Sequence, residues 1–227
     1  MVYYIHEELF DDDNFIEAVI SSVVKYICSN NKTSSYIENF LKHEKNISKL
    51  SSISQKLIDN GSVLIIDGTF DQITEEYKAK YIKNLCGQLS TNLNLTHFIP
   101  KQIKTNSEIV KSIAEGYAYS MKYGTSTGIP DDIKSSEEFK NNHSYINTLL
   151  LNNKNINGLF TDSLTDEHKE KYIKILSNIV SVNPCVAIKD EFLTHPLIIQ
   201  PLQKGILYYI SLGYFANVAK LIDKINP

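Results

Sequence analysis

Apolar residues recur every three or four positions along most of the chain, which is the spacing of amphipathic α-helices. The pattern is clearest after the acidic run that ends at Asp13, where the apolar residues are Phe15, Ile16, Val19, Ile20, Val23, Val24 and Ile27. Aspartates suit a helix start, because their carboxylates cap free N–H groups and favour the positive end of the helix dipole. The pattern predicts a helix at 13–29 and shorter helices at 34–43 and 47–60.

One stretch departs from helical spacing. Residues 62–67, SVLIID, form a short apolar run that has the composition of a strand. The rest of the sequence offers no clear partner run, so we interpret this stretch as buried extended chain or the edge of a helix. The Asn60-Gly61 pair just before it is a usual signal for the end of a helix.

Two segments of the sequence resemble each other. Residues 73–90 (ITEEYKAKYIKNLCGQLS) and 164–181 (LTDEHKEKYIKILSNIVS) lie 91 positions apart and agree at half of their eighteen positions. In each, a threonine is followed by two acids, which predicts helix starts at Thr74 and Thr165. The predicted inner faces are formed by Tyr77, Tyr81, Ile82, Leu85 and Leu89 in the first segment and by His168, Tyr172, Ile173, Leu176 and Val180 in the second.

A second pair of landmarks follows in the same order. GYAYSMKYG (116–124) and GILYYISLG (205–213) share Gly, Tyr and Gly at the same internal spacing. Tyrosine rings are often buried in helix-packing seams while their hydroxyl groups find polar partners. We therefore assign the tyrosines that recur in the two copies to the core: Tyr81, Tyr119, Tyr172 and Tyr208.

These patterns predict an all-α protein, either an internally duplicated helical bundle or a short array of helical hairpins with an N-terminal helical cap. We expect a single α-helical domain over 1–227, in which 1–50 form the cap, 52–130 the first helical unit and 143–220 the second. The loop between the units is expected at 123–138, YGTSTGIPDDIKSSEE, which is rich in Gly, Ser, Thr, Pro and Asp.

The stretch ILYYISLGYFANVAKLIDKINP at the end of the sequence resembles the helix-turn-helix of an ankyrin repeat. In this comparison Gly213 lies at the turn, and the second helix carries Val218, Leu221 and Ile222. The resemblance covers some twenty residues, without the usual TPLH opening or the period of about 33 residues found in ankyrin arrays. It implies a helical hairpin at this place and not an ankyrin fold.

Composition and charge narrow the classes of partner. The chain has 227 residues, of which 42% are hydrophobic and 22% charged, as in ordinary soluble domains. All 23 basic residues are lysine, and arginine is the side chain that grips phosphates and guanine edges in pairs. Together with the formal net charge of −3, this predicts no nucleic-acid partner. The abundance of Ile, Asn, Lys and Tyr indicates an AT-rich genome, which explains part of the arginine deficit.

The cysteines and the first residues indicate a cellular compartment. Cys28, Cys86 and Cys185 are far apart and odd in number, which is typical of free thiols in a reducing compartment. The first residues are acidic where a secretory signal would be basic and then apolar, and no run of apolar residues approaches eighteen. We therefore expect a cytoplasmic protein with no membrane partner.

The sequence contains no recognisable metal or cofactor motif. Its six histidines show neither the HExxH spacing nor a CxxC partner, and the loop with Gly124 and Gly128 lacks the GK[ST] ending of a P-loop. We therefore expect no metal and no cofactor.

The arrangement closest to a nucleophilic site is NPCVAIKDEFLTHPL. It places four reactive or titratable residues within eleven positions: Cys185, Asp190, Glu191 and His195. A cysteine enzyme needs its thiol within hydrogen-bond reach of a histidine, and that histidine is usually distant in sequence. In the alternative interpretation Cys185 is a small core residue and His195 lies near a helix start before Pro196.

Acidic residues gather at the start of the sequence, where no lysine occurs among the first twenty residues. They are Glu7, Glu8, Asp11, Asp12, Asp13 and Glu17. Such a patch attracts a basic partner at long range and meets its lysines or arginines in the complex. We predict that these six residues bind a partner. The alternative is that they solubilise the terminus and cap the first helix.

The absence of a catalytic motif, together with the repeat and the acidic start, favours a non-enzymatic protein-binding domain. Its sharpest form is an inhibitor or immunity-type protein that neutralises a basic protein toxin. Two alternatives stay open. One is an enzyme or effector of an unrecognised family with a cysteine-centred site around Cys185 and His195. The other is a scaffold protein that forms a homo-oligomer through its duplicated faces.

Overall fold

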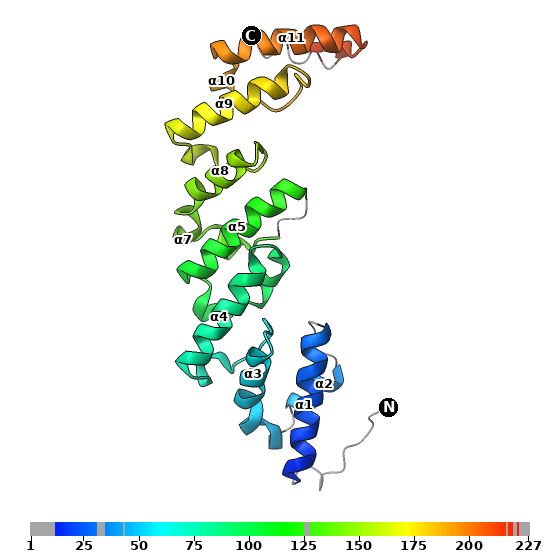
Figure 1. Ribbon diagram of the computed structural model, residues 1–227, viewed down its shortest axis with the longest axis vertical. Helices are drawn as coiled ribbons and strands as arrows, with labels where there is room; N and C mark the ends of the chain where they lie inside the picture. The colour runs from blue at the N-terminus through cyan, green and yellow to red at the C-terminus, as the bar shows by residue number, and fades with distance from the viewer. Residues whose placement is uncertain are drawn as a thin grey trace. The chain divides into compact units, whose positions relative to one another are not determined.

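The structure is a computed structural model and describes residues 12–30, 35–42, 44–124, 128–216, 218, 219 and 222. Within these residues the secondary structure consists of eleven α-helices and five short 3-10 helices, with no strand (Figure 1). The prediction of an all-α protein is therefore confirmed.

The chain divides into two compact units. Unit 1 contains residues 1–116 and 128–139, and unit 2 contains residues 117–127 and 140–227. Helix α5 (Ser107–Tyr123) contributes to both, because the division falls within it, after Gly116. The expected single domain, with its cap and two helical units, stays a prediction.

Unit 1 has its core between its first helices and the irregular stretch of chain that follows them. The cluster joins the apolar faces of α1 and α3 to α2 and Leu64. On α1 the buried residues are Ile16, Ile20, Val23, Val24 and Ile27, as the periodicity predicted. The elements that lie wholly or mostly in this unit are α1 (Asp13–Asn30), α2 (Ser35–Lys42), η2 (Glu44–Lys49), α3 (Leu50–Asp59), η3 (Phe70–Gln72), α4 (Glu75–Leu89), η4 (Leu93–Phe98), η5 (Lys101–Ile103), α6 (Asp131–Lys134) and α7 (Glu137–Lys140).

The apolar run SVLIID has no regular secondary structure and belongs to no sheet among the described residues, so its extended conformation stays a prediction. Val63 and Leu64 are buried, and the backbone finds its hydrogen bonds in side chains. The Tyr81 hydroxyl donates to the Val63 carbonyl (3.0 Å), and the Ser62 hydroxyl pairs with the Leu64 backbone (3.0 Å). These side chains satisfy polar groups that a neighbouring strand would otherwise satisfy.

Unit 2 is built around α9, which packs against α8 and α11 (Figure 1). The predicted inner face of α9 is confirmed, because His168, Tyr172, Ile173, Leu176 and Val180 are all buried. The complete elements of this unit are α8 (His143–Asn152), η6 (Thr161–Ser163), α9 (Asp166–Val180), α10 (Asp190–Leu193) and α11 (Pro196–Ser211).

The helices that open the two predicted copies end in the same way. Helices α3 and α8 each have ten residues and are followed by Asn60 and Asn153. Each asparagine amide donates to the backbone carbonyl four residues earlier, at 2.7 and 2.8 Å. The next residues, Gly61 and Lys154, both have positive φ, 76° and 56°. This is the usual left-handed termination of a helix.

The next long helices begin in the same way. Helices α4 and α9 have fifteen residues each, and the predicted starts at Thr74 and Thr165 are confirmed. Each threonine hydroxyl accepts a hydrogen bond from the backbone N–H three residues later, at 3.5 and 3.3 Å. These correspondences are local, and the internal duplication itself stays a prediction.

The loop expected at 123–138 contains helical turns, so that prediction is wrong in part. Pro130 precedes α6, whose first turn carries Asp131 and Asp132, and α7 follows. Ile133 and Phe139 are buried and anchor these short helices in the core. The composition indicated turns, but the buried side chains of Ile133 and Phe139 pack α6 and α7 against the rest of the protein. Residues 125–127 of this stretch lie outside the described residues.

The assignment of four tyrosines to the core is half right. Tyr81 and Tyr172 are buried, whereas Tyr119 is 42% exposed and Tyr208 is 49% exposed. The two exposed tyrosines lie three residues after Gly116 and Gly205, the glycines at which α5 contacts the end of α4 and α11 contacts the end of α9. Their recurrence marks an equivalent helix position, but that position faces solvent.

Candidate protein-binding surface

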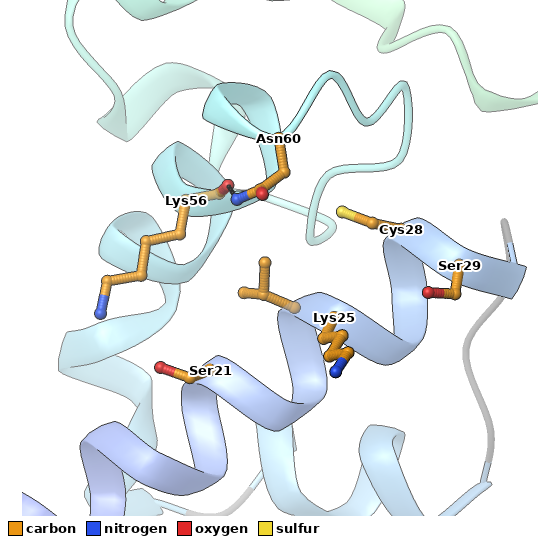
Figure 2. A pocket seen from close by; sticks show the side chains of 7 residues that line it. Ser21, Lys25, Cys28, Ser29, Lys56 and Asn60 are labelled. Carbon is orange, nitrogen blue, oxygen red and sulfur yellow. Dashed lines mark hydrogen bonds between the residues drawn. The ribbon is translucent and has the colours of Figure 1, made fainter.

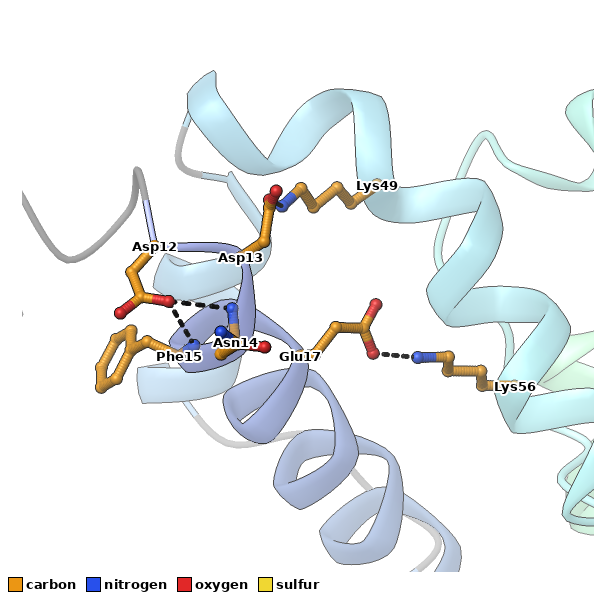
Figure 3. Close-up of polar contacts among 7 residues, drawn as sticks. All are labelled: Asp12, Asp13, Asn14, Phe15, Glu17, Lys49 and Lys56. Atoms are coloured by element: carbon orange, nitrogen blue, oxygen red, sulfur yellow. Dashed lines mark hydrogen bonds and ion pairs between the residues drawn. The ribbon is translucent and has the colours of Figure 1, made fainter.

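The described acids at the start of the chain are engaged with the protein itself. Asp12 caps α1, because its Oδ1 accepts from the backbone N–H groups of Asn14 (2.9 Å) and Phe15 (3.2 Å), as Figure 3 shows. This agrees with the alternative interpretation of the acids, in which they cap the first helix. Of the predicted partner-binding residues, Glu7, Glu8 and Asp11 lie outside the described residues.

Two further acids form ion pairs across the helices of unit 1. The Asp13 carboxylate lies 3.3 Å from the Lys49 ammonium group, and Glu17 pairs with Lys56 of α3 (Figure 3). Both carboxylates remain exposed, 95% for the Asp13 side chain. Exposed pairs of this kind contribute little to stability, and a partner's lysine can replace the internal one. Binding of a partner by these acids stays a prediction.

An open pocket of about 510 Å³ lies between α1 and α3 (Figure 2). Its lining residues are Ser21, Val24, Lys25, Cys28, Ser29, Lys56 and Asn60. Burial raises the pKa of the Cys28 thiol, so the thiol is protonated at neutral pH. Because the thiolate is the nucleophilic form, this cysteine is not set up for covalent chemistry.

A larger groove of about 900 Å³ opens beside the core of unit 1. Most of its lining is apolar, and three charged side chains also line it: Glu38, Lys42 and Asp67. Two of its apolar residues, Ile47 and Phe98, are open to solvent. A groove of this size and composition accommodates an apolar side chain or ligand.

The residues of the cysteine-centred hypothesis do not form a dyad in the structure. Cys185 is exposed in the turn after α9, so its assignment to the core is wrong. His195 caps α11, as the alternative interpretation expected: its Nδ1 accepts from the Leu197 backbone N–H (3.2 Å). Among the described residues no hydrogen bond joins Cys185 to His195. Asp190 and Glu191 form the first turn of α10.

His168 has a structural role within unit 2. Its backbone N–H donates to the Thr165 hydroxyl, and its Nδ1 accepts from the Thr165 backbone N–H, both at 3.3 Å. Its Nε2 lies 2.8 Å from the Thr148 hydroxyl, which ties α9 to α8. Both ring nitrogens are therefore used in the cap and in helix packing.

The most distinctive exposed feature of the described residues lies on α11 and the turn after it. We call it the α11 surface. It consists of Leu197, Ile199, Leu207, Tyr208, Ile210, Leu212, Tyr214 and Phe215. Leu207 is the most exposed of these, at 68%. Between Pro196 and Phe215 the sequence contains one charged residue, Lys204. A patch this rich in apolar residues exceeds the scattered exposed apolar residues of an ordinary surface.

Helix α11 exposes these residues because its apolar positions run around the whole helix. One side is buried through Ile198, Leu202 and Gly205, and Gly205 lies against the Val180 carbonyl at the end of α9. A helix that is apolar on all sides is normally covered on all sides. The sequence analysis missed this surface. The signal was present, because the sixteen-residue helix contains only one charged residue.

The described residues give no sign of a metal site or a membrane span. No group of three His, Cys, Asp or Glu side chains among them is arranged to hold a metal ion. None of the described helices has both the length and the apolar character that crossing a membrane requires.

Comparison with known proteins found no relative of this chain. No family model, no curated protein and no solved structure matches the chain.

Proposed function

We propose that this chain is a non-enzymatic protein-binding domain that binds its partner through the α11 surface. The observation that carries the proposal is the concentration of exposed Leu, Ile, Tyr and Phe side chains on one helix and its following turn. Water contact with so many apolar groups is unfavourable, and a partner that covers them gains the hydrophobic free energy.

The chemistry of the surface suits protein recognition. Tyr208, Tyr209 and Tyr214 form a chain of ring contacts, with centroids 6.4 and 5.3 Å apart. The Tyr209 hydroxyl donates to the Asn183 side-chain carbonyl (3.1 Å), which fixes one of these rings. Tyrosines combine a large apolar ring with a polar hydroxyl and are enriched among the residues that dominate binding energy. Packed aromatic rings beside exposed leucines are typical of the residues at the centre of a protein–protein interface.

Replacing Leu207 by lysine is expected to weaken partner binding and leave the fold unchanged. The side chain is already exposed, so its replacement removes no core contact. A charge at the centre of an apolar interface would have to be desolvated in the complex, which we expect to weaken binding by at least about tenfold. Affinity capture from lysate of the producing cell, compared between wild type and Leu207→Lys, measures this loss.

The matched control is Tyr26→Lys. Tyr26 is an exposed aromatic residue of α1 in unit 1 that lines neither the pocket nor the groove, and its replacement likewise puts a lysine in place of an exposed apolar side chain. We expect this variant to capture the same partner as the wild type. A partner retained equally by Leu207→Lys, or lost equally by both variants, contradicts the proposed role of the α11 surface.

A second form of the proposal keeps the basic partner that the acidic residues at the start of the sequence predict. In it the chain is an inhibitor or immunity-type protein that neutralises a basic protein toxin through Asp12, Asp13 and Glu17. The exposed, solvent-accessible pairs of Asp13 and Glu17 support this form, because little free energy is needed to exchange their lysines. A cytoplasmic location belongs to the proposal, in agreement with the three free cysteines.

The double variant Asp13→Asn, Glu17→Gln tests this form. The melting temperature is expected to stay unchanged, because both ion pairs are exposed. If the acids contact a basic partner, binding weakens and its dependence on salt becomes less steep. Surface plasmon resonance with the captured partner at low and high salt measures both quantities. Unchanged affinity and salt dependence would remove these two acids from the interface.

A further inference from the structure

Two residues of the run SVLIID have both of their backbone groups hydrogen-bonded within the protein. The Leu64 N–H donates to the Ser62 hydroxyl, and the same hydroxyl donates to the Leu64 carbonyl, both at 3.0 Å. The Ile66 N–H donates to the Ser54 hydroxyl (3.2 Å). The Ile66 carbonyl accepts from the backbone N–H (3.1 Å) and the hydroxyl (2.7 Å) of Thr69. The backbone is thus held at Leu64 and Ile66, two positions apart.

Ile65, which lies between them, has neither backbone group bonded. Among the described residues no hydrogen bond reaches its N–H or its carbonyl, and the same is true of the backbone of Asp67. In a strand, residues that pair with one neighbour alternate with residues that face the other side. Bonded and unbonded residues therefore alternate in this run as they do in a strand that is paired on one side only.

The unbonded residue lines the larger groove of unit 1. Ile65 is half-buried in the wall of this groove, whose volume is about 900 Å³. The rest of the lining is mostly apolar and includes Ile47 and Phe98, which are 57% and 48% exposed. A backbone N–H or carbonyl without a partner costs free energy when it is removed from water. The groove therefore offers one donor and one acceptor on an otherwise apolar wall.

The charged residues of the groove favour a basic ligand. Two of them are acids, Glu38 and Asp67, and one is a lysine, Lys42. Asp67 is exposed, and its carboxylate forms no ion pair with any residue in the part of the chain that the structure describes. It follows Ile65 by two positions, so both belong to the unbonded side of the run. A lysine or arginine of a ligand complements this carboxylate.

We infer that this groove is the docking site for an extended segment of a partner protein, which adds to Ile65 as a neighbouring strand would. One residue of the segment exchanges both backbone hydrogen bonds with Ile65, and its apolar side chains lie against Ile47 and Phe98. A basic residue lies beside Asp67. In strand addition of this kind the backbone bonds give affinity and the pockets give specificity. The site is separate from the α11 surface and does not depend on the proposed function.

The probe is the blocked peptide Lys-Val-Thr-Val-Thr-Val-Lys, which presents valines on one face when extended and carries a lysine at each end. Fluorescence anisotropy with the labelled peptide is expected to show saturable binding to the full chain, weaker at high salt. Two N-methylated forms, at the three valines or at the two threonines, remove N–H donors from one edge or the other. One form should lose at least about tenfold in affinity, and the other should bind like the parent.

Amide hydrogen exchange measured by NMR tests the pairing at Ile65 directly. In the free chain the Ile65 N–H is expected to exchange faster than those of Leu64 and Ile66, because only the latter two are hydrogen-bonded. The peptide should slow exchange at Ile65 by at least about tenfold. Slow exchange at Ile65 in the free chain would show that its N–H is already bonded and would contradict the inference.

Two variants of the full chain test the groove from the protein's side. Ile47→Lys places a charge in the apolar wall and should weaken peptide binding by about tenfold or more. Asp67→Asn should weaken it by about two- to fivefold and make it less sensitive to salt. Both side chains are exposed, so the fold should stay unchanged. The control Tyr26→Lys lies outside the groove and should bind like the wild type.

Backbone pairing is largely independent of side chains, so absence of saturable binding up to about 1 mM peptide would overturn the inference. Equal affinity of the two methylated peptides, or unchanged binding by Ile47→Lys, would overturn it as well. If the chain forms a dimer that Ile47→Lys disperses, the occupant is a second copy and the inferred partner is rejected.

The variant Leu207→Lys separates this site from the proposed function. It should bind the peptide like the wild type, because Leu207 lies in unit 2 and the groove in unit 1. If the peptide fails to bind while Leu207→Lys loses its captured partner, the proposed function stands and only the groove is rejected.

Discussion

Replacing Gly205 by alanine is expected to destabilise unit 2 by about 2 kcal/mol, although alanine is the better helix former. An added Cβ would lie 2.0 Å from the Val180 carbonyl oxygen and 3.1 Å from its carbon, and these are backbone atoms that no side-chain rotation can move away. Helices α9 and α11 must therefore separate. The loss of their packing exceeds the gain in helix propensity, which is about 1 kcal/mol. Urea unfolding followed by circular dichroism measures the change.

Gly87→Ala is the matched control, because it makes the same substitution inside a helix where space is free. Gly87 lies in α4, is exposed, and has no atom within 4 Å of the added Cβ. This variant should be more stable than the wild type, by up to about 1 kcal/mol. The two alanines are thus expected to act with opposite signs. Equal effects of the two substitutions would show that α11 does not lie against α9 at Gly205.

Replacing Phe139 by alanine is expected to cost about 3–5 kcal/mol of stability, the largest single effect that we predict. Phe139 is fully buried, and truncation removes its transfer free energy and leaves a cavity. It lies in α7, in the stretch that continues from the expected loop. A loop residue exposed to solvent would tolerate the same change. Thermal unfolding of the variant distinguishes the two cases.

The control for this variant is Phe98→Ala, in the same unit. Phe98 is about half exposed, so its truncation removes fewer contacts and is expected to cost much less. If the two variants lose similar stability, Phe139 is not the anchor that the structure indicates, and α7 is not held in the core.

The sequence by itself determined the helices and the faces that most of them bury. On α1 and α9 the apolar residues occupy one side, and the burial of Ile16, Ile20, Tyr172 and Leu176 follows from their spacing. The helix starts at Thr74 and Thr165 were also predictable, because the cap depends on residues that are adjacent in sequence. Periodicity and capping are local properties, so a single sequence records them.

Part of the candidate site depends on neighbours that are distant in sequence. The acids at the start of α1 were predicted as a patch, but the positions of Lys49 and Lys56 beside Asp13 and Glu17 follow only from the packing of α1 against α3. The burial of Phe139 likewise needed the surrounding core, because turn-forming residues dominate the local composition. In each case the deciding contact joins segments that the local pattern does not connect.

Only the tertiary structure decided which apolar stripe stays open. Both α5 and α11 carry apolar residues, and nothing in the local pattern marks Ala118 as buried and Leu207 as exposed. In the structure the residues that follow α8 bond to the end of α5, whereas Leu207 stays in solvent. A hydrophobic pattern records which side chains favour burial. Whether they are buried depends on how many neighbours the fold brings to each helix, and that is a property of the whole arrangement.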